Sequence, residues 1–343
     1  MTSSDRQQQE VSPHSPPELT VAVITSWTDR PFSRAVADLA LEGLFDIDLY
    51  CFHPADLDEV AQDRGERRLD AWLDRSLSEA AQESGCPASC FRIHAVTTSL
   101  PDAAAFEEER RGKARDLLAE VVQFAARKRV RAVQVRAGRR IESEGPSTAA
   151  GTGYRLRIRP AGALKQLVKS LGEVLTNEKV RDLEVGLALE IEPGPPYLLR
   201  DLTDVRELFY SIKDEPWRSR VGLNLDIGHC LIRDWTPNQF AELAAEMGIE
   251  LFHCHLSDHS RQHFADLSIG AKHRLRPGEP AGGDDPREIA DWLDHFRKCC
   301  AEGGRFCTRT VSLELEAIED PLAVHASYRA AHAALRSMPH SSR

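Results

Sequence analysis

The chain has 343 residues, of which 41% are hydrophobic, so it can bury a large core as one domain or two. Its 44 Lys and Arg residues and 54 Asp and Glu residues give a net charge of −10, which repels nucleic acid and anionic membrane surfaces. The sequence has no basic start followed by an apolar segment, and no apolar run of about 18 residues. Its eight cysteines lack the spacing of a disulfide scaffold. These features predict a cytoplasmic protein that has neither nucleic acid nor membrane as a partner.

Strands and helices are predicted to alternate from residue 19 onward. Residues 1–18 are rich in Ser, Gln and Pro and predict a disordered tail. Period-2 apolar patterns predict eight strands, at residues 19–25, 45–52, 90–96, 130–136, 183–191, 221–225, 251–256 and 310–315. Amphipathic patterns predict a helix after each strand, at residues 31–42, 57–83, 103–128, 161–176, 202–212, 237–247, 286–299 and 322–335.

Eight consecutive strand–helix units require a parallel sheet, and they match a (β/α)8 TIM barrel better than an open sheet. A doubly wound sheet would place a Gly-rich dinucleotide-binding turn after the first strand, and residues 25–29 contain no glycine. We therefore predict an α/β protein with a single barrel domain at residues 19–336 and a flexible C-terminal tail at residues 337–343.

The last four predicted strands end in acidic or imidazole side chains. These are Glu190 and Glu192, Asp226 and His229, His253, His255 and Asp258, and Glu314 and Glu316. The C-terminal ends of all strands meet at one mouth of a barrel, where carboxylates repel one another unless a cation lies among them. The pattern indicates a divalent metal site. Alternatively, Asp226 caps the helix that follows it, and His253 is expected to pack inside the barrel.

Five motifs in the second half of the chain resemble those of a known superfamily. They are LALE at residues 187–190, GLNLDIGH at 222–229, HLSD at 255–258, RPGEP at 276–280 and VSLE at 311–314. The xylose isomerase-like TIM-barrel superfamily, which has similar motifs, includes sugar isomerases and epimerases, inosose and dehydroshikimate dehydratases, and apurinic endonucleases. The resemblance extends from residue 19 to about residue 335 and is strongest from residue 183 onward.

The resemblance implies one divalent metal held by Glu190, Asp226, His255 and Glu314. It also implies that Glu190 and Glu314 relay a proton, as their counterparts do in the epimerases, and that His229 contacts the substrate. This donor set consists mostly of oxygen, which favours Mn2+, with Mg2+, Co2+ or Zn2+ as alternatives.

The alignment of these motifs with the superfamily could be shifted by two residues. Such a shift would put Glu192 or Glu316 in place of Glu190 or Glu314, because residues two apart lie on one side of a strand.

Six further residues are expected near the substrate: His94, Arg136, Asp258, His273, Arg274 and Arg276. His94 and Arg136 are predicted to end the third and fourth strands, where the guanidinium could bind a carboxylate or phosphate. Asp258 would support the metal ligands, and the loop that contains Arg274 and Arg276 closes over the metal in the resembling family. The Gly-, Ser- and Thr-rich loop at residues 141–153 is expected to act as a lid.

The resemblance implies an isomerase or epimerase that acts on a small polyhydroxylated carbonyl compound, a sugar or sugar-derived acid. The metal would polarise the carbonyl and stabilise an enediolate. A dehydratase of a keto-cyclitol or dehydroshikimate-like compound is the alternative. A trinuclear phosphodiesterase and a non-catalytic metabolite-binding relative are less favoured. The resembling endonucleases have an Asp-x-His motif after HLSD, whereas this chain has Ala271 in place of the Asp, followed by Lys272 and His273. A homodimer is left open.

Overall fold

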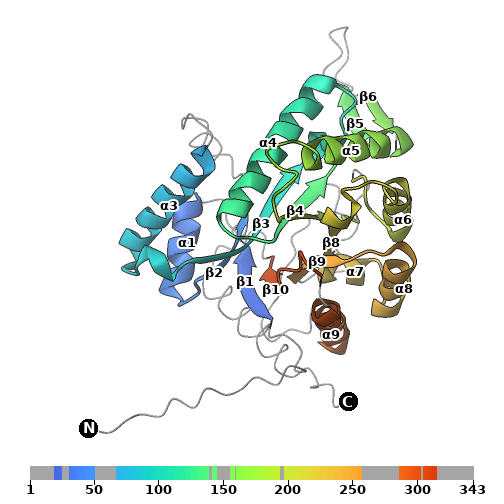
Figure 1. Cartoon of the computed structure of the whole chain (residues 1–343). Helices are drawn as coiled ribbons and strands as arrows, with labels where there is room; N and C mark the ends of the chain where they lie inside the picture. The colour runs from blue at the N-terminus through green and yellow to red at the C-terminus, as the bar shows by residue number, and fades with distance from the viewer. Residues whose placement is uncertain are drawn as a thin grey trace.

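The protein is a closed parallel barrel in this computed structural model (Figure 1), as predicted. The structure describes residues 19–24, 31–50, 67–138, 141–144, 155–158, 160–193, 197–256, 286–302 and 304–314. The barrel strands are β1 (Thr20–Ile24), β2 (Asp46–Tyr50), β3 (Arg92–Leu100), β4 (Ala132–Ala137), β7 (Gly186–Glu190), β8 (Val221–Asp226), β9 (Leu251–Leu256) and β10 (Thr310–Leu313). They close in the order β1-β10-β9-β8-β7-β4-β3-β2. The predicted tails and the predicted helix at residues 322–335 lie outside the described residues.

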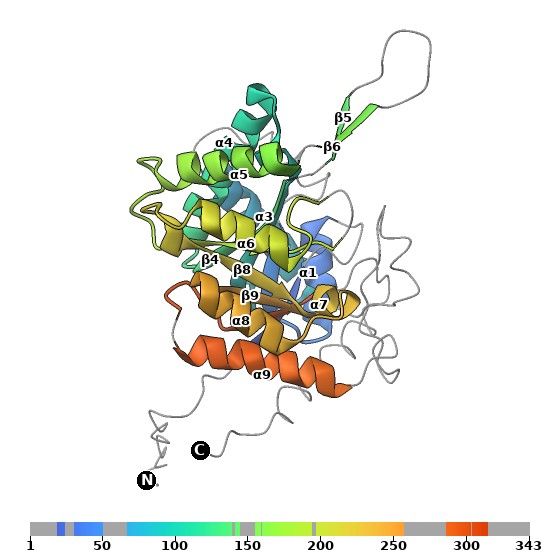
Figure 2. The same cartoon turned by 90° about the vertical axis from the view of Figure 1, so that its right-hand side faces the viewer.

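Helices cover the outside of the barrel. They are α1 (Phe32–Leu41), α3 (Arg68–Ser84), α4 (Glu108–Arg127), α5 (Pro160–Leu175), α6 (Leu202–Ser211), α7 (Ile227–Ile232), α8 (Pro237–Met247) and α9 (Pro286–Glu302). Figure 2 shows α5, α6, α8 and α9 side by side along one flank. The strands face these helices with apolar residues such as Val133, Val135 and Leu225, which belong to one continuous core. In the described part of the chain, no helix has both the length and the apolar composition needed to cross a bilayer.

The interior of the barrel changes from apolar at its N-terminal end to polar at its mouth. Near the start of the strands, Phe252 packs against a small apolar group, Ala132, Ala188 and Phe306. Gly186 and Gly222 make room for its ring, because an added Cβ would lie 2.7 Å and 2.8 Å from Phe252 atoms. Farther along the strands the buried side chains are polar: Asp48, Thr97, Gln134, Asn224, His253 and Ser312.

The structure departs from the predicted elements at several places. The residues after Pro101 first form a short 3-10 helix, η2 (Pro101–Ala104), so α4 begins at Glu108 instead of residue 103. The first turn of α4 contains two glutamates, which are favourable near the positive end of a helix dipole. Two further 3-10 turns are η1 (Ala88–Cys90) and η3 (Arg218–Arg220). β3 continues to Leu100 because it pairs with β4 up to Ala137.

The predicted lid loop, residues 141–153, begins with the strand β5 (Ile141–Glu144). This strand forms a two-stranded antiparallel ribbon with β6 (Arg155–Ile158), which lies just after the loop, and Ile141 is opposite Ile158. This ribbon projects from the body of the barrel in Figure 2. The helix α7, which follows Asp226 directly, was foreseen only as the capping alternative.

Candidate metal centre

Four side chains converge at the C-terminal ends of neighbouring strands. Glu190 and Asp226 are the last residues of β7 and β8, His255 is the last but one of β9, and Glu314 follows β10. Each offers one potential ligand atom, and these atoms lie within 4.8 Å of one another. All four residues are at most 3% exposed. The structure therefore brings together the four residues that the sequence predicts as metal ligands, and we refer to them as the mouth cluster.

Asp226 has a local role as well as a place in this cluster. Its Oδ1 accepts a 2.9 Å hydrogen bond from the backbone N–H of His229 and so caps α7. Its Oδ2 lies 3.5 Å from Nδ1 of His229. The capping alternative is thus correct. It uses only Oδ1, so it is compatible with the predicted role of Asp226 as a metal ligand.

Arg136 places a guanidinium among the carboxylates of the mouth. Its Nε lies 3.0 Å from Oε2 of Glu190 and 2.9 Å from Oε1 of Glu192, and its Nη2 donates to Oε1 of Glu314. Burial would raise the pKa of Glu190, but the attraction of Arg136, together with the hydrogen bond and the charge of His255, lowers that pKa to about 2. Glu190 is therefore ionised at neutral pH.

Glu192 and His229 lie at the edge of the cluster. Burial, with repulsion from neighbouring carboxylates, raises the pKa of Glu192 well above its usual value, although Arg136 opposes the shift. Burial lowers the pKa of His229, whose Nε2 is 3.6 Å from Oε2 of Glu192. The surroundings at the edge of the mouth thus favour the uncharged forms of both the Glu192 carboxyl group and the His229 imidazole.

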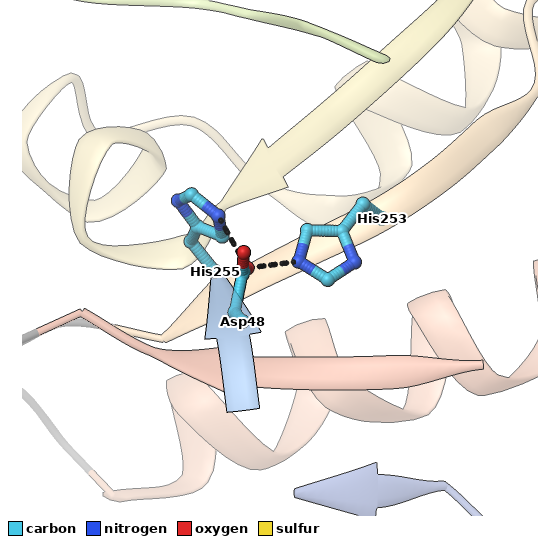
Figure 3. Close-up of side chains that lie close together, drawn as sticks. All are labelled: Asp48, His253 and His255. Atoms are coloured by element: carbon cyan, nitrogen blue, oxygen red, sulfur yellow. Dashed lines mark hydrogen bonds and ion pairs between the residues drawn. The ribbon is translucent and has the colours of Figure 1, made fainter. Parts of the chain in front are cut away.

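A second polar group supports His255 from deeper in the barrel (Figure 3). Asp48, on β2, accepts a 2.9 Å hydrogen bond from the Thr97 hydroxyl and lies 3.0 Å from Nε2 of His253. Its Oδ2 is 3.6 Å from Nε2 of His255, whose Nδ1 lies 2.9 Å from Oε2 of Glu314. Burial would raise the pKa of Asp48, but its contacts with the two histidines hold that pKa well below the usual range. His253 is fully buried, as expected from the sequence.

The mouth cluster fits a divalent cation. Three buried carboxylates and an imidazole form a donor set suited to an ion such as Mn2+ or Mg2+, with zinc also compatible. One of its buried atoms, Oε1 of Glu190, makes no hydrogen bond within the described part of the chain. Buried polar atoms of this kind are costly unless a ligand uses them or stabilises their neighbours.

One predicted substrate residue lies at the wrong end of the barrel. His94 was placed at the end of the third strand, but it is the third residue of β3, which runs on to Leu100. Its Nε2 lies 2.6 Å from Oδ1 of Asp46, the first residue of β2. His94 therefore belongs to the N-terminal end of the barrel, and we withdraw it as a substrate contact.

The other predictions divide between the mouth and the part of the chain outside the described residues. Arg136 lies in the mouth, as expected for the end of the fourth strand. Of the two neighbouring glutamates, Glu190 belongs to the mouth cluster and Glu192 does not. The remaining predicted residues lie outside the described residues: Asp258, His273, Arg274, Arg276 and Glu316.

Two contributors to the site were missed from the sequence. Gln134 donates to Oε2 of Glu190, and Asp48 supports His255. Gln134 stands two residues before Arg136, so the period of a strand places both on the interior side. Asp48 lies in the middle of a short strand between Ile47 and Leu49, where an acidic residue between two apolar residues of a strand is the available signal.

Comparisons with known proteins agree with this architecture. A D-tagatose 3-epimerase-like protein has 16% identity and a TM-score of 0.60, with 93% of this chain and 97% of the other covered. D-psicose 3-epimerase from Clostridium cellulolyticum H10, solved with D-tagatose, has 14% identity and a TM-score of 0.59, covering 93% and 99%. The IOLI protein, solved with a zinc atom, has 15% identity and a TM-score of 0.60, also covering 93% and 99%. At these identities the likeness shows the fold.

A search of curated proteins found no match. A profile of a protein family, however, matches residues 39–330, which is most of the chain and includes every member of the mouth cluster. The chain belongs to the xylose isomerase-like TIM barrel family.

Proposed function

We propose that this protein is a divalent-metal-dependent isomerase or epimerase of a small polyhydroxylated carbonyl compound, either a sugar or a sugar-derived acid. The observation that carries the proposal is the convergence of Glu190, Asp226, His255 and Glu314 at the barrel mouth. Membership of the family and the fold shared with sugar epimerases support the same class of reaction. Mn2+ is our first choice of metal, with Mg2+, Co2+ and Zn2+ as alternatives.

The proposed reaction assigns the proton transfers to two glutamates. An ion in the mouth cluster would polarise the substrate carbonyl and so acidify the neighbouring C–H group. Glu190 and Glu314 reach the mouth from β7 and β10, which are separated by β8 and β9. One glutamate, as a carboxylate, takes the proton from carbon, which leaves an enediolate. The other, as a carboxylic acid, gives its proton to the opposite face or to the adjacent carbon. Glu190 is ionised and can act as the base.

Neighbouring residues would bind and orient the substrate. His229 is uncharged and buried beside Glu190 and Asp226, so it can exchange hydrogen bonds with a substrate hydroxyl. Arg136 has a planar fork of donors that is suited to a carboxylate. Asp258, His273, Arg274 and Arg276 stay predictions for the same role.

A dehydratase is the second candidate, and the state of Glu192 favours it. A dehydratase begins with the same removal of a proton from carbon, and it then needs an acid that protonates the departing hydroxyl group. The pKa of Glu192 is raised well above its usual value because the carboxyl group is buried among other carboxylates, and this favours its protonated form. It could therefore supply that proton.

The first test is metal content, measured by mass spectrometry on protein reconstituted with Mn2+ or Co2+. We expect one equivalent in the wild type and a loss of bound metal in Asp226→Ala and His255→Ala. Glu190→Gln and Glu192→Gln form a matched pair, of which only the first should weaken metal binding. Little metal in the reconstituted wild type would overturn the proposal, and three equivalents would favour a trinuclear phosphodiesterase.

Deuterium incorporation distinguishes the reactions. The metal-loaded protein would be incubated with ketoses, sugar acids and cyclitols in D2O and followed by NMR. An isomerase or epimerase should introduce deuterium at the carbon next to the carbonyl, whereas a dehydratase should release water and form a new double bond. A protein that binds these compounds but exchanges no hydrogen would be a non-catalytic relative.

A further inference from the structure

Asp48 is a buried carboxylate with three polar neighbours and no place in the mouth cluster. It is fully buried in the middle of β2. The Thr97 hydroxyl donates to its Oδ1 at 2.9 Å, while Nε2 of His253 and Nε2 of His255 lie 3.0 Å and 3.6 Å from its Oδ2. Figure 3 shows the carboxylate between the two imidazole rings. An ionised carboxylate only accepts hydrogen bonds, so this position favours imidazole nitrogens that carry hydrogen.

The hydrogen bonds of His253 fix which of its nitrogens carries the hydrogen. Its Nδ1 lies 2.8 Å from Oγ1 of Thr308, and that oxygen already accepts a hydrogen bond from the backbone N–H of Thr310. The Thr308 hydroxyl can therefore donate its own hydrogen to Nδ1 of His253. The hydrogen of His253 is then on Nε2, which faces Asp48 at 3.0 Å and the Ser312 hydroxyl at 2.9 Å. The ring of His253 stands at 88° to that of His255, with their centres 5.2 Å apart.

The same carboxylate orients His255. A neutral imidazole has one N–H group and one nitrogen lone pair, and a metal binds the lone pair. Nε2 of His255 faces Asp48, whereas Nδ1 faces Oε2 of Glu314 at 2.9 Å and Oε1 of Glu190 at 3.5 Å. Both nitrogens thus face carboxylate oxygens. A metal bound to Glu314 and Glu190 would displace the hydrogen from Nδ1, and the acceptor beside Nε2 would then retain the hydrogen there, so that Nδ1 binds through its lone pair.

We propose that Asp48 is a positioning residue that holds His255 with its Nδ1 toward the metal and increases the donor strength of that nitrogen. The inference rests on the proposed metal centre. Carboxylates that accept the second N–H of a metal-bound histidine commonly change metal affinity by about 10- to 100-fold. Asp48 reaches this position from β2, on the side of the barrel away from β7 and β8.

The test is Mn2+ affinity, measured by titration calorimetry on the full-length chain. Asp48→Asn keeps the shape of the side chain and is expected to weaken Mn2+ binding about 10- to 100-fold. Asp48→Ser should give a similar loss, so the test does not depend on one variant folding. The matched control is Thr97→Val, which removes a hydrogen bond to Asp48 but retains the carboxylate, and it should stay within about threefold of the wild type.

Each outcome has one meaning. Wild-type affinity in Asp48→Asn would overturn the inference and leave the metal centre intact, whereas a wild type that binds no Mn2+ would overturn the proposed function itself. An equal loss in Thr97→Val would show a general disturbance of the barrel interior and would also overturn it.

The visible absorption of the Co2+-loaded protein gives a second reading, because it depends on ligand geometry. At saturating Co2+ the bands should change in Asp48→Asn but not in Thr97→Val. Unchanged bands in Asp48→Asn would overturn the role in orientation.

Discussion

The two ends of the barrel contain the same types of residue in different proportions. At the N-terminal end, one carboxylate has two cationic or imidazole partners. Arg92 donates to Asp46 from Nε at 2.7 Å and from Nη2 at 2.6 Å, and Nε2 of His94 lies 2.6 Å from Oδ1 of Asp46. Both oxygens of Asp46 therefore have partners within the protein.

At the mouth the proportion is reversed, because Arg136 is shared by Glu190, Glu192 and Glu314. Carboxylates that are buried in excess of their counter-charges reduce stability, unless a ligand supplies positive charge. The comparison indicates that the carboxylate at the N-terminal end is satisfied within the protein, whereas the mouth has the excess of carboxyl groups that the proposed metal centre would use. This division agrees with the general rule that barrel enzymes keep their chemistry at the C-terminal ends of the strands.

The largest effect should come from removing a carboxylate at the mouth. Glu314→Gln is expected to lower kcat by about 10²- to 10⁴-fold, because the amide cannot exchange a proton with the substrate carbon. The measurement is steady-state turnover at saturating metal, with the substrate that the deuterium experiment identifies. Binding of that substrate should be much less affected than turnover.

A change at the other end of the barrel provides the control for Glu314→Gln. Asp46→Asn removes one carboxylate in the same manner, and it should retain turnover. If Glu314→Gln lost metal but still bound the same compound as tightly as the wild type, the protein would be a metabolite-binding relative and the mouth would lack the catalytic role assigned to it.

A smaller effect, of opposite sign to the other mouth variants, is expected from Arg136→Gln. The guanidinium shares Glu190 and Glu314 with any cation that enters the cluster. Its removal should increase Mn2+ affinity, by roughly tenfold at low salt, because one competing positive charge is lost. Titration calorimetry in buffers of low and high ionic strength would measure this. Weaker Mn2+ binding would show instead that Arg136 holds the two carboxylates in place for the metal.

The barrel and the mouth cluster could be predicted because both depend on regular patterns. Period-2 apolar segments such as residues 221–225 define buried strands, and the barrel places their ends together whatever their distance in sequence. Glu190 and Glu314 are 124 positions apart, yet only two strands separate them in the barrel. The motif resemblance then distinguished Glu190 from Glu192, and the described geometry agrees with that choice.

Depth along a strand could not be predicted in the same way. The apolar pattern predicts that the third strand ends at residue 96, which would place His94 at the mouth. Pairing with β4 extends β3 to Leu100 instead. Asp48 was overlooked because its partners, His253 and Thr97, come from strands whose relative register depends on bulges. One such irregularity lies between Ile47 and Asp48 and another between Leu223 and Asn224. Shifts of this kind follow from three-dimensional packing and leave no periodic signal in the sequence.

The smallest expected effect concerns the stability of Asp46→Asn and its dependence on pH. Burial would raise the pKa of Asp46, but His94 and Arg92 together lower it below its ordinary value of 3.8. A lowered pKa means that the folded protein binds a proton less readily than the unfolded chain, so the stabilisation is present above pH 3.8 and is lost as the pH falls through the lower, folded pKa. Urea unfolding should show Asp46→Asn to be less stable by about 1 kcal/mol at pH 7, with a constant difference down to about pH 5 that shrinks below about pH 4.

The Mn2+ affinity of Asp46→Asn should not change, since the two ends of the barrel are separated by the layers of interior side chains. A tenfold loss of affinity would show that the ends are coupled, and the contrast between a stabilising end and a functional end would not hold for this protein.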